Sequence, residues 1–247
     1  MSLIAAERIK LASTRSPWWC TAFAVLSTVA LSVVAALAMA RDSFIPVTVA
    51  TTQMGYTLGM AVVMVMAALA VTTEYSVGTI RTTFLAMPHR GHALAAKTVV
   101  VAILAFLIGL AVSLSSWAIG LLVLPDADLA LHGATQWRQV GGVALVYAVA
   151  AVIAVAVGTL TRHTAGAVAI VLVWTLMAEQ LLVVIPGIGE AAQPFLPFQA
   201  AKQFLSAGEV PADASLLSQP WFAMLYFAAT AAALLAIGIG VARRRDA

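Results

Sequence analysis

The ionisable side chain placed deepest inside an apolar stretch of this chain is Glu179, with Gln180 beside it. A charge at the centre of a membrane helix costs roughly 2.5–3.5 kcal/mol, so this position needs a compensating partner. One interpretation is that Glu179 faces a cavity and meets a substrate or a coupling ion. The other is that Glu179, six residues before Ile185 and so about 9 Å from the outer helix end, pairs with a loop cation such as Lys202.

A second chemical candidate is the segment from Gly91 to Thr98, GHALAAKT, which is one residue away from the phosphate-binding pattern G-x-x-x-x-G-K-[ST]. Ala96 replaces the second glycine, and no strand precedes the segment. Lys97 stands at the mouth of an apolar helix, where we expect it to snorkel towards the membrane surface. We therefore expect this chain to bind no cofactor, and any ATP and Mg²⁺ to be bound by another subunit.

Other reactive residue types form no convincing set. His89 and His92 are three residues apart, but no carboxylate or thiol accompanies them at ligand spacing, so we expect no metal site. Candidate nucleophiles and bases fall on opposite sides of the membrane, which disfavours hydrolysis and predicts that the chain is not an enzyme. The positive charges follow the pattern of membrane loops and form no basic domain, so nucleic acid is not an expected partner.

The elements that position these residues are membrane helices. The chain has 247 residues, of which 63% are apolar and 9% charged, whereas soluble domains carry about 25% charged residues. Six continuous apolar runs are long enough to cross a membrane, which takes about 20 residues. They cover approximately residues 18–40, 51–73, 98–124, 140–160, 165–185 and 221–242. The expected fold is an all-α integral membrane protein of a cell membrane, with six spans in one domain, residues 1–247.

The distribution of positive charge predicts the orientation of the spans. With six crossings, ten Lys and Arg residues fall on one side and three on the other. The larger set is Arg8, Lys10, Arg15, Arg81, Arg90, Lys97, Arg162, Arg243, Arg244 and Arg245, and the smaller set is Arg41, Arg138 and Lys202. Because cytoplasmic loops carry the excess, both termini are predicted to be cytoplasmic.

Residues 74–97 form a polar and basic segment between the second and third spans. On a helical projection Val77, Ile80, Phe84 and Met87 share one stripe, and Pro88 ends the helix. Such a helix either lies among lipid headgroups or docks a soluble partner that moves the membrane part.

The remaining segments give weaker expectations. Residues 1–17 are predicted to lie on the cytoplasmic membrane surface, ahead of the aromatic pair Trp18-Trp19. The proline-rich outer loop 186–220 is expected to contain short helices, for instance from Phe198 to Ser206. Gly55-x-x-x-Gly59 allows a close helix approach, either within the chain or between two copies.

With these features the chain resembles the membrane subunits of bacterial ATP-binding-cassette (ABC) exporters of type 2, small six-span permeases common in actinobacteria. The resemblance covers the whole chain. It is most specific in the N-terminal ERIKLASTRSPWW, in the E-x-x-x-G-T-I-R run from Glu74 to Arg81, in the Met87-Pro88-x-Arg90 step and at Lys97.

The resemblance implies that residues 74–97 hold a coupling helix that sits in a cleft of a separate ABC ATPase. It implies that Val77, Ile80 and Phe84 anchor this helix, that Gly78-Thr79 allow a close turn, and that Arg81 and Arg90 meet ATPase or phospholipid charges. The full set of expected coupling residues is Glu74, Tyr75, Val77, Gly78, Thr79, Ile80, Arg81, Phe84, Pro88 and Arg90. The resemblance also implies two permease protomers, which are identical or related, and two ATPase subunits.

The expected function is therefore the permease subunit of an ATP-driven exporter. The family implies a path between the first, second and fifth spans. The candidate residues along it are Glu179, Gln180, Gln53 and Tyr56. Since the spans hold almost no charge, we expect a hydrophobic or amphipathic cargo such as a drug or lipid. Two rival hypotheses are a self-contained channel or secondary carrier that uses Glu179, and a membrane anchor or sensor that transports nothing.

Overall fold

The computed structural model describes residues 16–40, 47–77, 90–206 and 219–245. Within these ranges, six helical stretches are long and apolar enough to cross a membrane. Four of them are continuous helices: α2 (Ser16–Ala40), α6 (Arg90–Val123), α7 (Ala134–Thr161) and α12 (Pro220–Arg245). The predicted all-α membrane fold with six spans is confirmed.

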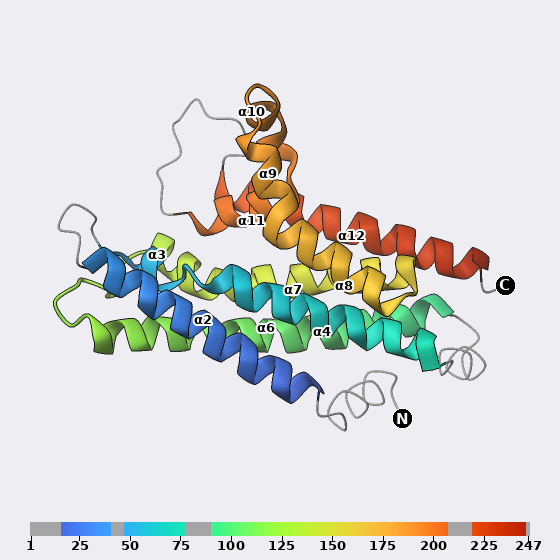
Figure 1. The fold of residues 1–247 in the computed structure, drawn as a ribbon, viewed down its shortest axis with the longest axis horizontal. Helices are drawn as coiled ribbons and strands as arrows, with labels where there is room; N and C mark the ends of the chain where they lie inside the picture. Colours follow the sequence, from blue (N-terminus) through green and yellow to red (C-terminus); the bar gives the residue numbers. More distant parts are fainter. Residues whose placement is uncertain (1–15, 41–46, 78–89, 207–218, 246–247) are drawn as a thin grey trace.

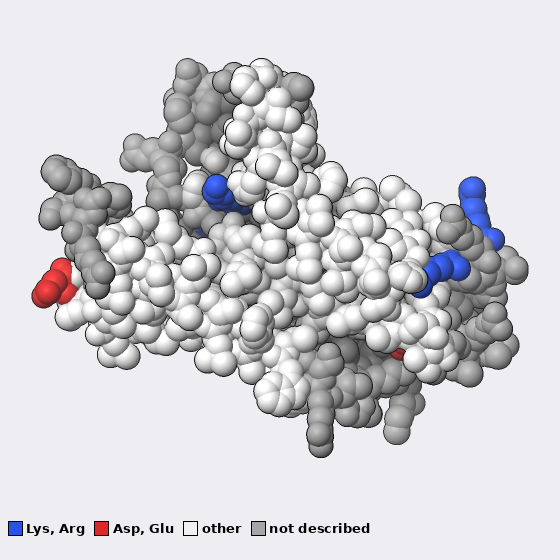
Figure 2. Space-filling view, viewed as in Figure 1, with Lys and Arg blue, Asp and Glu red and all other residues white. Residues whose placement is uncertain are grey.

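The helices run side by side as an elongated bundle (Figure 1). The starts of α2, α6 and α8 and the ends of α4, α7 and α12 lie towards one end of it. Figure 2 shows that the visible face is almost free of charge, with Lys and Arg atoms mainly at that same end and beside the projecting α9–α11 region. The start of α2 and the end of α12 therefore lie towards the same end of the bundle, as an even number of crossings requires.

The centre of the bundle is α7, which packs against α4, α6 and α12. Its buried positions are mostly Ala, Val and Gly, and such small side chains let helix backbones approach closely in a membrane. Tyr147 is the largest side chain in this core, and its phenol donates a hydrogen bond of 2.8 Å to the carbonyl oxygen of Tyr56. This bond ties α7 to the second span.

The second span is broken into α3 (Val49–Thr52) and α4 (Tyr56–Val77). At the break, the Gly55 N–H donates to the Ser32 hydroxyl of α2 at 3.1 Å, and the Gln53 amide donates to the Ser113 carbonyl oxygen of α6 at 3.2 Å. These partners satisfy groups that have no water to bind at this depth.

The Gly55-x-x-x-Gly59 motif packs within the chain, against α2. A Cβ atom at Gly55 would lie 2.3 Å from the Thr28 carbonyl oxygen, and one at Gly59 would lie 2.2 Å from the Thr28 hydroxyl. Of the two interpretations that the sequence left open, the structure supports intramolecular packing.

The fifth span and the outer loop fold back onto the bundle. The span consists of α8 (Thr164–Val173), a π-helical turn (Trp174–Ala178) and α9 (Glu179–Val184). After α10 (Ile188–Ala192) and a 3-10 turn (Gln193–Phe195), α11 (Pro197–Leu205) returns to pack against α12 and α7. The short helix predicted from Phe198 to Ser206 is α11.

Candidate functional site

The cytoplasmic ends of α4 and α6 are joined by a buried ion pair. The Lys97 ammonium lies 2.8 Å from a carboxylate oxygen of Glu74, and the two side chains are 7% and 13% exposed. Lys97 also donates to the Ala70 carbonyl oxygen at 3.3 Å. The expectation that Lys97 snorkels to the surface is therefore wrong, because an anion one helix away binds the ammonium inside the bundle.

The turn between α7 and α8 joins the same region. The Arg162 guanidinium lies 5.1 Å from the centre of the Tyr75 ring, a distance at which a cation is attracted to the ring face. Arg162 caps α7 in the left-handed conformation, with φ 55°. We call Glu74, Tyr75, Lys97 and Arg162 the cytoplasmic junction. It links the second, third and fourth spans, and three of its residues, Glu74, Tyr75 and Lys97, belong to the segment predicted to couple to a partner.

Most of the predicted coupling residues lie outside the described residues: Gly78, Thr79, Ile80, Arg81, Phe84 and Pro88. The described chain reaches Val77 as the last residue of α4, with its side chain 74% exposed, and resumes at Arg90 as the first residue of α6. Val77 is thus accessible to a partner at the cytoplasmic end.

Glu179 is buried, with 1% of its surface exposed, and acts as a cap for α11. Its Oε1 accepts hydrogen bonds from the Trp174 indole N–H at 2.9 Å and the Phe198 N–H at 3.1 Å, and its Oε2 accepts one from the Gln199 N–H at 2.9 Å. The first helical residue, Pro197, has no N–H. The carboxylate therefore satisfies the donors of the first turn that would otherwise lack a partner, at the helix end that favours negative charge.

This arrangement differs from both interpretations of Glu179 drawn from the sequence. In the described part of the chain no ion pair joins Glu179 to Lys202. Glu179 also lines neither of the two cavities described below. Its partners are backbone N–H groups and an indole, and neither kind of partner was predicted from the sequence.

A cavity of about 380 Å³ lies between the second, fourth and fifth spans and α11, and we call it the polar cavity. Gln53, Tyr56 and Gln180, three of the four residues predicted along a substrate path, line it together. Gln139 of α7 and Lys202 of α11 also line it. These last two were missed as path residues: Gln139 comes from α7, which packs against the second span, and Lys202 is brought there by the return of α11.

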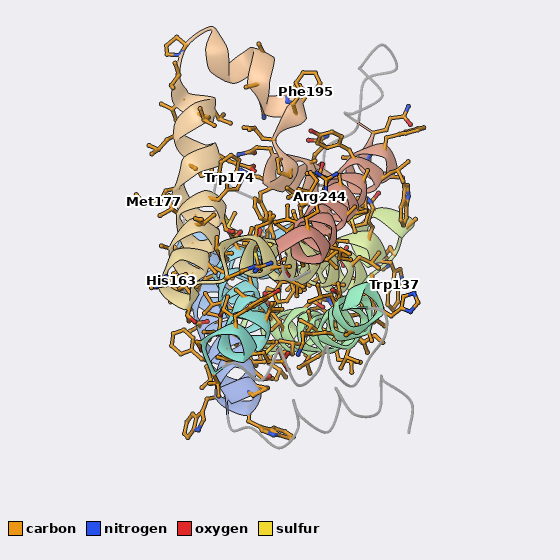
Figure 3. All side chains as sticks on the ribbon, turned by 90° about the vertical axis from the view of Figure 1, so that its right-hand side faces the viewer. Trp137, His163, Trp174, Met177, Phe195 and Arg244 are labelled. Atoms are coloured by element: carbon orange, nitrogen blue, oxygen red, sulfur yellow. The ribbon has the colours of Figure 1, made fainter. Side chains whose placement is uncertain are left out.

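A second cavity of about 350 Å³, which we call the apolar cavity, lies between α4, α7, the fifth span and α12. Trp174, Ile170, Met64 and Leu234 contribute to its wall. Figure 3 shows Trp174 on the side of the fifth span that faces α12, whereas Met177 points away from the bundle. Thr175 and Phe198 line both cavities, so the two lie next to each other.

A metal-binding role finds no support among the described residues, where no group of three His, Cys, Asp or Glu side chains is placed to hold an ion.

Comparison with known proteins identifies the family. Residues 3–178 match the model of the ABC-2 family transporter proteins, a match that covers more than half of the chain. A search of curated proteins found no match.

Proposed function

Because this chain belongs to the ABC-2 family of transporter proteins, we propose that it exports a hydrophobic or amphipathic substrate with energy from a separate ATPase. Members of this family are membrane permease subunits of ABC transporters, multi-pass proteins of the cell membrane that associate with an ABC ATPase. The outward direction, the class of substrate and the coupling to ATP hydrolysis are our proposal.

The observation that carries the coupling step is the cytoplasmic junction. A force applied by an ATPase to the chain between Val77 and Arg90 reaches α4 and α6 at once, because the Glu74–Lys97 ion pair holds them together. The contact between Tyr75 and Arg162 extends this link to the turn where α7 meets α8, the start of the fifth span. Nucleotide binding in the partner would thereby change the relative positions of the spans around the polar cavity.

The secondary-carrier alternative loses its main argument. It requires Glu179 to exchange an ion with a cavity, but both carboxylate oxygens accept hydrogen bonds from buried donors. The breaks in the second and fifth spans, which such a carrier would also show, are accounted for by the contacts of Gly55 and by the cap of α11.

We propose an assembly of two permease protomers, identical or related, and two ATPase subunits, with ATP and Mg²⁺ bound by the ATPase alone. The test is to co-express the chain with a partner ABC ATPase and to measure ATP-dependent substrate flux in proteoliposomes. Flux that needs no ATPase would indicate a channel or carrier. Co-purification of the ATPase without ATP-dependent flux of any substrate would indicate an anchor.

Two matched variants test the docking site. Val77 and Val184 are the last residues of α4 and α9, at opposite ends of the bundle, with side chains 74% and 77% exposed. Val77→Asp should reduce the amount of ATPase that co-purifies, because it places a charge in the expected contact, and Phe84→Asp should do the same. Val184→Asp should retain the ATPase. Equal retention by Val77→Asp and Val184→Asp would place the docking site elsewhere.

A further inference from the structure

The polar cavity contains hydrogen-bonding groups that the described protein leaves unused. The amides of Gln53, Gln139 and Gln180 lie along its wall, and Gln139 is only 3% exposed. Gln53 donates from its Nε2 to Thr52 and Ser113, which fixes the orientation of its amide. The Gln53 Oε1 is buried and accepts no hydrogen bond within the described ranges. Buried polar groups without partners are costly, so this lining is suited to a polar ligand.

The charge of the lining is positive. Lys202 is the one ionisable Lys, Arg, Asp or Glu among the described residues that line the polar cavity, and it forms no ion pair with them. The nearby Arg138 is already engaged, since its guanidinium donates to the carbonyl oxygens of Phe204 and Ser206 at the end of α11. The Lys202 ammonium is therefore the group available to an anion.

The apolar cavity has the opposite character. Three hydroxyl groups line it, and each is already hydrogen-bonded to the protein. Thr175 donates to the Met64 sulfur at 3.4 Å, Tyr226 to the Phe195 carbonyl oxygen at 2.7 Å, and Thr230 to the Tyr226 carbonyl oxygen at 2.9 Å. The rest of the wall is aliphatic and aromatic. Such a cavity suits a hydrocarbon chain, because its lining offers a polar group no free hydrogen-bond partner.

The two cavities meet at Phe198 and Thr175. The Phe198 backbone is fixed by Glu179, and its ring packs against Phe227 with the ring centres 5.7 Å apart. A cationic, amide-rich cavity thus adjoins an apolar one across a fixed aromatic side chain. Together the two cavities suit a molecule with a polar head and an apolar chain.

We propose that the cargo is a single-chain amphiphile with an anionic head group that carries hydroxyl donors. Its anionic group binds Lys202, its hydroxyl groups bond to the amides of the lining, and its chain occupies the apolar cavity. This inference rests on the proposed export function and names the class of substrate for it. Glu179 is a positioning residue, which holds Trp174 and Phe198 in the wall between head and chain.

The test uses three probes on the permease purified with its ATPase: a radiolabelled lysophosphatidate, the lysophosphatidylcholine of the same chain length, and glycerol phosphate. Lysophosphatidate should bind more tightly than lysophosphatidylcholine, because both carry a free glycerol hydroxyl but only the head of lysophosphatidate is a net anion. Glycerol phosphate should not bind measurably, since it lacks the chain. Equal affinity for the two lysolipids would refute the preference for an anionic head group. Measurable binding of glycerol phosphate would refute the requirement for a hydrocarbon chain.

Variants locate each half of the ligand. Lys202→Gln should weaken lysophosphatidate binding about tenfold or more, as expected for the loss of a charge-assisted contact, and should leave lysophosphatidylcholine unchanged. Lys202→Arg should bind as wild type does. Ile170→Trp should weaken both lysolipids by filling the apolar cavity, whereas Ile103→Trp, at a similarly exposed position on α6, should weaken neither. Unchanged lysophosphatidate affinity in Lys202→Gln would refute the head-group contact. Unchanged affinity in Ile170→Trp would refute the placement of the chain in the apolar cavity.

ATP-dependent flux measured on the same preparations separates this inference from the proposed function. If the ATPase drives export of other compounds while lysophosphatidate fails to bind, the substrate class is wrong and the export function stands. If lysophosphatidate binds as described but no compound is transported with ATP, the export function is wrong and the site stands.

Discussion

Replacing Lys97 by Met removes the positive member of the cytoplasmic junction and keeps most of the side-chain length. The Glu74 carboxylate is only 13% exposed and its distance to the Lys97 ammonium is 2.8 Å. Removing one partner of a buried ion pair typically costs roughly 3–5 kcal/mol, because the remaining charge stays buried. Both side chains are far below a third exposed, so solvent screening does not reduce this figure to that of a surface pair.

The double variant Glu74→Leu with Lys97→Met separates the ion pair from simple packing. Replacing a buried pair by apolar side chains of similar volume is often neutral or even stabilising. We therefore expect the double variant to regain most of the stability that Lys97→Met loses. The two substitutions should be strongly non-additive, as is usual for residues in direct contact.

The assay is reversible unfolding in mixed detergent micelles, followed by circular dichroism. Asp128 and His132 provide the control, because their contact of 3.3 Å joins side chains that are 79% and 69% exposed. Asp128→Asn should change the unfolding free energy by less than about 1 kcal/mol. If Lys97→Met costs no more than Asp128→Asn, or if the double variant loses as much as the two single variants added together, the reasoning about the junction is wrong.

Two further predictions concern the packing that shapes the cavities. Glu179→Ala should lower the unfolding free energy by about 1–3 kcal/mol, because two N–H groups of α11 lose their acceptor, and Glu179→Gln should cost less. Wild-type stability in Glu179→Ala by the same micelle assay would contradict the capping role. Gly59→Val should destabilise by about 1–3 kcal/mol, because a Cβ there would lie 2.2 Å from the Thr28 hydroxyl. Gly240→Ala, where nothing lies within 4 Å, should not destabilise, and equal losses in the two glycine variants would contradict the packing of α4 on α2.

The membrane spans were predictable because a continuous apolar run has one physical solution in lipid. Their ends were less so. The third span was expected to start at residue 98, whereas α6 starts at Arg90. A hydropathy pattern stops at the first charge, but a helix does not, because Lys and Arg are good helix formers. The ion pair with Glu74 on α4 lets the Lys97 charge lie inside the bundle. That partner becomes visible only once two helices are placed side by side.

The break in the second span was not predicted, although its glycines were noticed. Gly55 permits a close approach, but the break itself depends on the Ser32 hydroxyl, which accepts the Gly55 N–H from a neighbouring helix. For the same reason the sequence identified Gln53, Tyr56 and Gln180 as path residues but not Gln139. The sequence shows each polar residue near the end of an apolar run. Which of them line the same cavity depends on how the helices and the outer loop pack together.

The partner of Glu179 was not predicted from the sequence. A carboxylate inside an apolar span needs a partner, and a cation or a substrate was expected. The sequence also contains a second unmet requirement: α11 begins with Leu196-Pro197, and leucine has no side-chain acceptor to cap a helix. A helix without a cap and a carboxylate without a cation satisfy each other, which the hydrogen bonds to Phe198 and Gln199 bear out. Matching unmet donors with unmet acceptors across a whole membrane chain would have placed α11 against the fifth span, and with it the wall between the two cavities.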